Sequence, residues 1–234
     1  MSKMSLYAMS DLHLSHFKEK PMDIFDEIWH NHTEKILKNW NEIVSCDDTV
    51  IVNGDLSWGM AMEEAKPDLD FIYALNGNKI IVQGNHDYYW NSTSKLNDMY
   101  SNMFFIKNNY AVYEDYAICG TKGWICPNDT RYTDHDSKIY KREAGRLKFS
   151  LDMAIKNGYN ESNIIVATHF PPTNDSQENS LFTDILKSYN IKRVIYGHLH
   201  GANKYNNSLL GNVNGIEYSL VSADYLNFKP IKIL

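Results

Sequence analysis

Five short polar clusters, each at the end of an apolar strand-like run, constrain this 234-residue chain more than any other feature of its sequence. In chain order the clusters are Asp11-Leu12-His13, Gly54-Asp55, Gly84-Asn85-His86-Asp87, His169 and Gly197-His198-Leu199-His200. In open α/β sheets, ligand-binding residues lie in loops just past the carboxyl ends of the strands. Because all five clusters occupy that position, the sequence predicts that they meet at one end of a sheet.

The first half of the chain alternates predicted strands with predicted helices. Strands are expected over residues 6–10, 49–53 and 79–83, where apolar residues run together. A long helix is expected over residues 21–44, where residues of one face recur at spacings of three and four: Phe25, Trp29, His32, Ile36, Trp40 and Ile43. A second, weaker helix is expected over residues 61–75, with a break or a late start caused by Pro67.

The second half of the chain predicts a different arrangement, with short strands and tight connections. These strands are expected over residues 104–107, 110–113 and 116–120. The remaining elements are, in order, a helix over 137–156, a strand over 163–168, a helix over 181–189, a strand over 193–196, hairpin turns over 201–215 and a strand over 216–221. Since the sequence contains no repeat, low-complexity tract or linker, residues 1–234 are expected to form one mixed α/β domain, with two sheets flanked by helices.

Composition narrows the class of partner and the location. A net charge of −6 and a pI near 5.8 argue against general nucleic-acid binding, which needs a basic surface. A small anionic substrate stays compatible, because bound metal ions would reverse the local charge. No stretch resembles a signal sequence or approaches the ~20 apolar residues that span a bilayer. The odd number of cysteines, without a C-x-x-C pair, favours reduced thiols and a cytoplasmic protein. Nothing in the sequence indicates the oligomeric state.

The first two clusters contain residue types that bind metal ions. Asp11 and His13 are two residues apart, so at an extended strand end they would project to the same side and could share one ion. Gly54 allows close backbone approach, and the two oxygens of Asp55 could bridge two cations. Either cluster alone would also fit an ordinary turn.

The third cluster is more specific. Asn85 offers a neutral carbonyl oxygen, which as a ligand would limit the negative charge of the site. His86 lies next to it and could face a bound phosphate without binding metal, and an unperturbed pKa near 6.5 suits it to donate a proton to a leaving oxygen. Asp87 could orient that ring or cap the following turn.

The last two clusters add imidazoles. His169 follows a buried strand and precedes two prolines, and the spacing of His198 and His200 allows them to point at two different ions. Taken singly, His169 could instead be a core histidine, and His198 and His200 could be a surface pair. Taken together, the five clusters predict a two-metal site, because so many polar groups at strand ends would be costly without ions to satisfy them. Such sites generally perform hydrolytic chemistry.

The order D-x-H, G-D, G-N-H-[D/E], H and G-H-x-H resembles the calcineurin-like metallophosphoesterase superfamily from Asp11 to His200. The resemblance implies a four-layer α/β/β/α sandwich of two mixed sheets flanked by helices, with a dinuclear centre between the sheet edges. It also implies that one ion is bound by Asp11, His13, Asp55 and His200. A second ion would be bound by Asp55, Asn85, His169 and His198, with His86 as the general acid.

This ligand set predicts a metal-dependent hydrolase of phosphate esters. Two ions of Mn, Fe, Zn, Co or Ni would hold a bridging hydroxide that attacks phosphorus while His86 protonates the leaving group. The protein phosphatase branch carries an arginine soon after G-D, whereas this chain has Leu56-Ser57-Trp58-Gly59. The chain is therefore more similar to the phosphodiesterase-type branches, and diesters are expected ahead of monoesters. A phosphomonoesterase acting on nucleotides or proteins, or a non-catalytic scaffold that binds partners, is the alternative.

A few further residues could serve function or packing. Trp58 and Trp124 could stack on a base or sugar, with core packing as the alternative. The loop over 127–137, with Arg131 and His135, is expected at the substrate rim. The basic stripe of the predicted 137–156 helix is interpreted as a solvated face: Lys138, Arg142 and Arg146.

Overall fold

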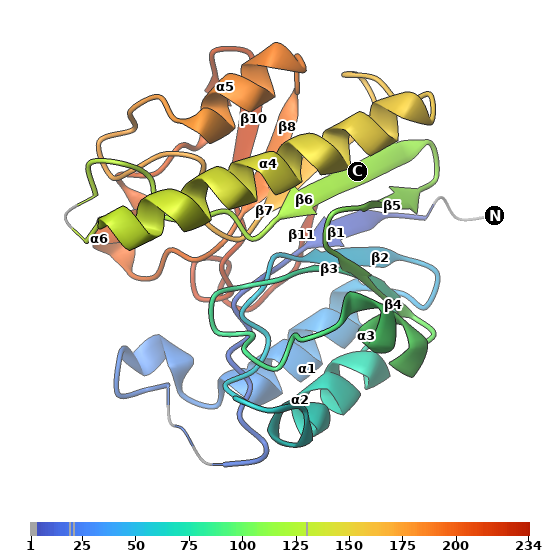
Figure 1. Ribbon diagram of the computed structural model, residues 1–234. Helices are drawn as coiled ribbons and strands as arrows, with labels where there is room; N and C mark the ends of the chain where they lie inside the picture. Colours follow the sequence, from blue (N-terminus) through green and yellow to red (C-terminus); the bar gives the residue numbers. More distant parts are fainter. Residues whose placement is uncertain (1–3, 19, 21, 130) are drawn as a thin grey trace.

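The computed structural model describes residues 4–18, 20, 22–129 and 131–234, and it contains two mixed sheets (Figure 1). The first sheet has five strands in the order β11-β1-β2-β3-β4. Their bounds are β1 Leu6–Ala8, β2 Thr49–Val52, β3 Asn78–Val82, β4 Met103–Ile106 and β11 Ile231–Lys232. Strands β1 to β4 pair in parallel, whereas β11 pairs antiparallel with β1 at the edge.

The second sheet has six strands in the order β5-β6-β7-β8-β10-β9. Their bounds are β5 Tyr110–Tyr113, β6 Tyr116–Thr121, β7 Ile164–Thr168, β8 Arg193–Tyr196, β9 Gly211–Val213 and β10 Ile216–Leu220. The four central strands are parallel, and the two outer ones are antiparallel to their neighbours. Each sheet therefore presents a row of parallel carboxyl ends at one edge.

Helices cover the outer face of each sheet, which gives the expected four layers (Figure 1). The first sheet is covered by α1 His32–Ile43, α2 Met62–Ala74 and α3 Thr93–Met99, preceded by the 3₁₀ turn η1 Glu27–Trp29. The second is covered by α4 Asp134–Lys156 and α5 Leu181–Ser188, and the short α6 Ala202–Tyr205 follows β8. The predicted sandwich of two mixed sheets flanked by helices is confirmed. Among the described residues, none of the helices combines the length and the hydrophobicity that spanning a bilayer requires.

Alternation of side chains along the strands divides the core into three apolar layers. In β2, Val50 and Val52 pack in the cluster beneath the first sheet's helices, while Ile51 points to the opposite sheet. There it joins Ile118 and Ile195 of the second sheet. Because both faces of the central strands are covered, their sequences read as continuous apolar runs rather than as an alternating pattern.

Two helix predictions were wrong. The expected helix over 21–44 is interrupted: Asp26 caps the 3₁₀ turn by accepting from Ile28 N–H at 3.0 Å, and Asn31 adopts a left-handed φ of 53° before α1 begins. Its predicted start at residue 21 lies outside the described residues. The expected break or late start at Pro67 does not occur, since α2 runs from Met62 to Ala74 with Pro67 inside it.

Candidate metal centre

The carboxyl ends of β1, β2 and β3 in one sheet and of β7 and β8 in the other bring the predicted ligands together. Two groups form, one of Asp11, His13 and His200 and one of Asp55, His169 and His198. Within each group, one ligand atom per residue lies within 4.8 Å of the others. Asn85 adjoins the second group, since its Oδ1 is 2.8 Å from His169 Nε2. The structure thus gathers all seven residues that the sequence predicted as ligands.

The backbone at these positions is strained. Asp11, His13, Asp55 and His198 have φ values of 58°, 46°, 52° and 70°, in the left-handed region that side chains with a Cβ rarely adopt. Each residue lies in the loop that follows β1, β2 or β8, within five residues of the strand end. Strain of this kind costs energy and is concentrated at functional sites.

Two motif glycines are required by close packing rather than by a turn. A Cβ on Gly84 would lie 2.1 Å from Asp55 Oδ1, and a Cβ on Gly197 would lie 2.4 Å from Asp11 Oδ2. No side chain fits at either position without displacing a predicted carboxylate ligand. The glycines of the G-N-H and G-H-x-H motifs therefore leave room for the carboxylates.

In the first group, two imidazoles face each other. His13 Nε2 and His200 Nε2 are 3.3 Å apart, and His200 Nε2 is 3.5 Å from Asp11 Oδ1. The other ring nitrogen of His200 lies 2.9 Å from Asp224 Oδ1, which orients the ring toward Asp11. Asp224 follows β10, a parallel neighbour of β8, and was missed in the sequence because it belongs to none of the five motifs. The strand-end rule that found the other residues would have found it.

In the second group, His169 is the central ring. Its Nδ1 lies 2.8 Å from the carbonyl oxygen of Asn53, while its Nε2 lies 3.2 Å from His198 Nδ1 and 3.4 Å from Asp55 Oδ2. The Asn53 side chain donates to carbonyls of β7 and β8 at 2.9 and 3.0 Å, which ties the two sheets beneath the centre. The backbone therefore fixes which nitrogen of His169 faces the site.

The protonation states of three of the four imidazoles suit metal binding. Burial lowers the pKa of His13 and His198 well below the ordinary value and that of His169 to about 4, so these rings are neutral and carry free lone pairs at neutral pH. His200 differs: burial works to lower its pKa, but Asp11 and Asp224 outweigh burial and raise that pKa to about 10, so this ring is charged at neutral pH and compensates Asp11. Burial works to raise the pKa of Asp11, but His200 and His169 outweigh it and hold that pKa below its usual range. Burial, with Asp87 and Asp11 nearby, raises the pKa of Asp55 well above the usual range.

The site fits a pair of cations. Asp11 and Asp55 are buried together, and no lysine or arginine in the described ranges lies within 4 Å of either carboxylate. The buried His13 Nδ1 has no hydrogen-bond partner among the described residues. Two buried carboxylates are destabilising unless positive charge compensates them. Carboxylate, carboxamide and neutral imidazole are the donors that transition-metal ions accept.

Asp87 has a role that neither sequence hypothesis anticipated. Its buried carboxylate accepts from the backbone N–H groups of Asp55, Leu56 and Gly84 at 3.0, 2.9 and 2.7 Å. It therefore joins the loops after β2 and β3, rather than orienting His86. Burial raises the pKa of Asp87 to about 6.

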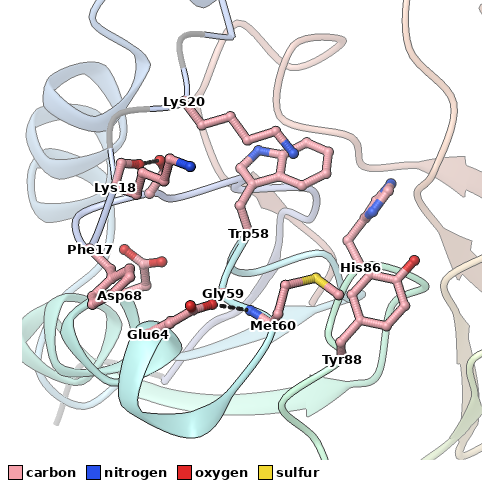
Figure 2. Close-up of a pocket in the computed structure, with 11 residues that line it drawn as sticks. Phe17, Lys18, Lys20, Trp58, Gly59, Met60, Glu64, Asp68, His86 and Tyr88 are labelled. Atoms are coloured by element: carbon pink, nitrogen blue, oxygen red, sulfur yellow. Dashed lines mark hydrogen bonds between the residues drawn. The ribbon is translucent and has the colours of Figure 1, made fainter.

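A pocket of about 640 Å³ opens beside His86, and we call it the Trp58 pocket. Figure 2 shows the Lys20 side chain reaching the Trp58 ring, with His86 beside both Trp58 and Tyr88. The Lys20 ammonium lies 3.2 Å from the centroid of that ring. The ring centroids of Trp58 and His86 are 4.4 Å apart, so Trp58 forms a wall of this pocket rather than only packing in the core.

A second pocket, of about 440 Å³, lies on the side of the second ligand group, and we call it the Trp124 pocket. It is lined by Asn85, Tyr88, Lys122, Trp124, Arg131 and His198, among others. Of the two residues expected at a substrate rim, Arg131 lines this pocket, while His135 is exposed in the first turn of α4. Farther along α4, Arg142 and Arg146 pair with the buried Glu143, so this part of the basic stripe is not simply solvated.

Comparison with known proteins identifies the family. A family model described as calcineurin-like phosphoesterase matches residues 4–202, a range that contains both ligand groups. The chain belongs to the calcineurin-like phosphoesterase family. Membership implies metal-dependent phosphoester hydrolysis as the family's chemistry, in agreement with the donors gathered at the strand ends.

One curated relative matches part of the chain. The chain is 30% identical over 92 residues to an uncharacterized protein of Methanocaldococcus jannaschii, an alignment that covers 37% of this chain and 49% of the relative. The chain thus spans about half the length of the curated relative that it matches.

Solved structures of low sequence identity share the fold. The phosphopantetheinyl hydrolase of Mycobacterium tuberculosis is 15% identical, with a TM-score of 0.59 over 100% of this chain and 96% of that one. A protein of unknown function from Aquifex aeolicus is 18% identical, with a TM-score of 0.53 over 98% and 96% of the two chains. At these identities the likeness shows the fold alone.

Proposed function

We propose that this protein hydrolyses phosphate esters with two divalent transition-metal ions, and that it prefers diesters to monoesters. The observation that carries the proposal is the position of Asp55 between the two ligand groups. Its Oδ2 is 3.4 Å from His169 Nε2 in its own group and 3.9 Å from His13 Nε2 in the other. A carboxylate within reach of both groups is what two closely spaced ions require.

The ligands divide between the ions as the groups suggest. One ion would be held by Asp11, His13, Asp55 and His200, and the other by Asp55, Asn85, His169 and His198. Bound there, the ions would polarise the phosphoryl oxygens and lower the pKa of a coordinated water. The mixture of nitrogen and oxygen donors suits Mn, Fe, Zn, Co or Ni better than Mg or Ca.

His86 would supply the proton to the leaving group. Its backbone N–H donates to Asp55 Oδ1 at 2.8 Å, which fixes the residue beside the centre. Its ring is about one-third exposed and lines the Trp58 pocket, with Nε2 4.0 Å from Asp55 Oδ2. A ring in this position borders both the centre and the space where a leaving group would lie, as a general acid must.

The expected preference for diesters rests on Trp58. A monoester dianion carries one more negative charge than a diester, and an arginine beside the centre would compensate it. In this chain the segment after Asp55 instead places the indole of Trp58 in the pocket wall. The indole is neutral, so at the place where an arginine would lie this chain offers no charge to compensate the monoester dianion.

The test is the hydrolysis of bis-p-nitrophenyl phosphate and of p-nitrophenyl phosphate by metal-stripped protein reloaded with Mn²⁺. We expect a higher kcat/KM for the diester and loss of both activities with chelator. A preference for p-nitrophenyl phosphate would instead make the protein a phosphomonoesterase. Binding of two ions without hydrolysis of either ester would favour a partner-binding scaffold.

A further inference from the structure

The two pockets border the candidate metal centre on different sides of one loop. The Trp58 pocket includes His86, whereas the Trp124 pocket includes Asn85 and His198, which belong to the second ligand group. Tyr88 lines both pockets. A phosphorus atom at the centre would therefore have a cavity for each of two ester substituents, and a monoester would leave one of them unused.

The Trp124 pocket contains a half-buried cation without an anionic partner. The ammonium of Lys122 lies 4.4 Å from the centroid of the Trp124 ring, and it makes no ion pair or hydrogen bond with the residues that the structure describes. The Lys122 carbonyl accepts from the backbone N–H groups of His169 and Phe170 at 3.2 and 2.9 Å, so its position is fixed relative to the centre. The Lys122 side chain is half-buried, so water solvates the ammonium incompletely.

The other charges of this pocket largely cancel, which leaves Lys122 as its unpaired cation among the described residues. Arg131 adds a second cation, held by Asp129 at 3.2 Å. Asp87 also lines the pocket, but its carboxylate is buried and its oxygens already accept three backbone N–H groups. The Trp58 pocket differs, because its two lysines are accompanied by Glu64 and Asp68. In the described part of the chain, Lys122 is therefore the cation beside the second ligand group that has no ion pair of its own.

We propose that the Trp124 pocket binds the substituent that stays on phosphorus and that this substituent carries a negative charge. This inference rests on the proposed phosphodiesterase function. The leaving group occupies the Trp58 pocket, because His86 lines that pocket. The water oxygen bonds to phosphorus, the bond from phosphorus to the leaving oxygen breaks, and that oxygen takes the His86 proton. The proton lost by water restores His86, and the product is a monoester that retains the anionic substituent.

The test uses three p-nitrophenyl diesters that share the leaving group and differ in the retained substituent: 2-carboxyethyl, ethyl and choline. We expect the Mn²⁺-loaded protein to hydrolyse the anionic ester best and the cationic one worst. In Lys122→Gln, the ratio of kcat/KM between these two esters should fall about tenfold, mainly through KM, since the charge is bound in the ground and transition states alike. The ratio in the unmodified protein should also shrink as ionic strength rises.

The matched control is Lys20→Gln, which removes the other lysine that lies on a tryptophan. Because Lys20 belongs to the leaving-group pocket, its substitution should leave the ratio as it is. Arg131→Gln should also lower the ratio, and it replaces Lys122→Gln as the test variant if Lys122→Gln does not fold. Hydrolysis of all three esters without an order by charge, or an equal effect of Lys20→Gln, would overturn this inference alone. If none is hydrolysed although two ions are bound, the proposed function fails and this inference with it.

Discussion

The ring of His200 is positioned by a residue outside the five motifs. Asp224 lies 2.9 Å from His200 Nδ1 and also accepts from the hydroxyl of Tyr205. A carboxylate behind a ligating imidazole fixes the ring and makes the opposite nitrogen a better donor. Asp224 is therefore expected to tune the ion held by Asp11 and His13 without touching it.

We expect Asp224→Asn to weaken the binding of one of the two ions by roughly ten- to a hundredfold and to leave the other unchanged. Competition with a chromogenic chelator measures both affinities. The matched control is Tyr205→Phe, which removes a hydrogen bond to Asp224 but keeps the carboxylate behind His200. If Asp224→Asn binds both ions as tightly as the unmodified protein, the positioning role is wrong.

If His86 is the general acid, substituting it should impair proton donation but not metal binding. We expect His86→Asn to retain its metal content but to lose roughly 10²–10⁴ in turnover of an alkyl ester, whose leaving oxygen needs a proton. The loss should be much smaller for p-nitrophenyl esters, since p-nitrophenolate leaves without protonation. Equal losses on both kinds of ester, or loss of bound metal, would contradict a general-acid role.

At the start of β3, a buried lysine joins the strand to the end of helix α2. Lys79 is 1% exposed, and its ammonium donates to the carbonyl oxygens of Leu75 and Tyr73 at the helix C-terminus. Burial lowers the pKa of Lys79 to about 8 from 10.5. The helix dipole offsets part of the cost of burying this charge but does not remove it.

The lowered pKa predicts a pH dependence of stability. Below pH 8, Lys79 is charged in both the folded and unfolded states, and the full penalty for the buried charge applies. As pH rises from 8 to 10.5, the folded state releases its proton first, so the penalty decreases by up to about 3 kcal/mol. The free energy of unfolding relative to Lys79→Met should therefore rise over this interval, as measured by urea denaturation. A difference in free energy of unfolding between the two proteins that stays constant from pH 7 to 10.5 would contradict the lowered pKa of Lys79.

The central strands could be predicted from the sequence, but the short edge strands β9 and β11 and several other elements could not. Buried parallel strands read as apolar runs, and β2, β3, β7 and β8 were found within about one residue of their ends. The interruption at Asn31 depends on a single left-handed residue, which the apolar spacing around it does not register. Helix α3 and strand β11 were missed because each is too short to show a period, and both depend on packing against their sheet.

At the scale of the whole molecule, the centre exists only because two sheets meet. Asp11 and His198 are far apart in the chain, yet the backbone N–H of His198 donates to Asp11 at 2.9 Å. The strand-end positions of the motifs predicted this meeting, since parallel strands present their carboxyl ends at one edge. The support beneath it could not be predicted in the same way, because the bonds from the Asn53 side chain to β7 and β8 exist only once the two sheets have packed.

The most direct test of a two-metal phosphoesterase is a titration of metal-stripped protein with Mn²⁺. Bound metal per chain and hydrolysis of bis-p-nitrophenyl phosphate are followed together. We expect two ions to bind and activity to appear with the second, whereas Asp55→Asn, lacking a charged bridging ligand, should fail to hold the pair. Full hydrolysis by the metal-free protein, or saturation of binding and activity at one ion per chain, would contradict a two-metal phosphoesterase.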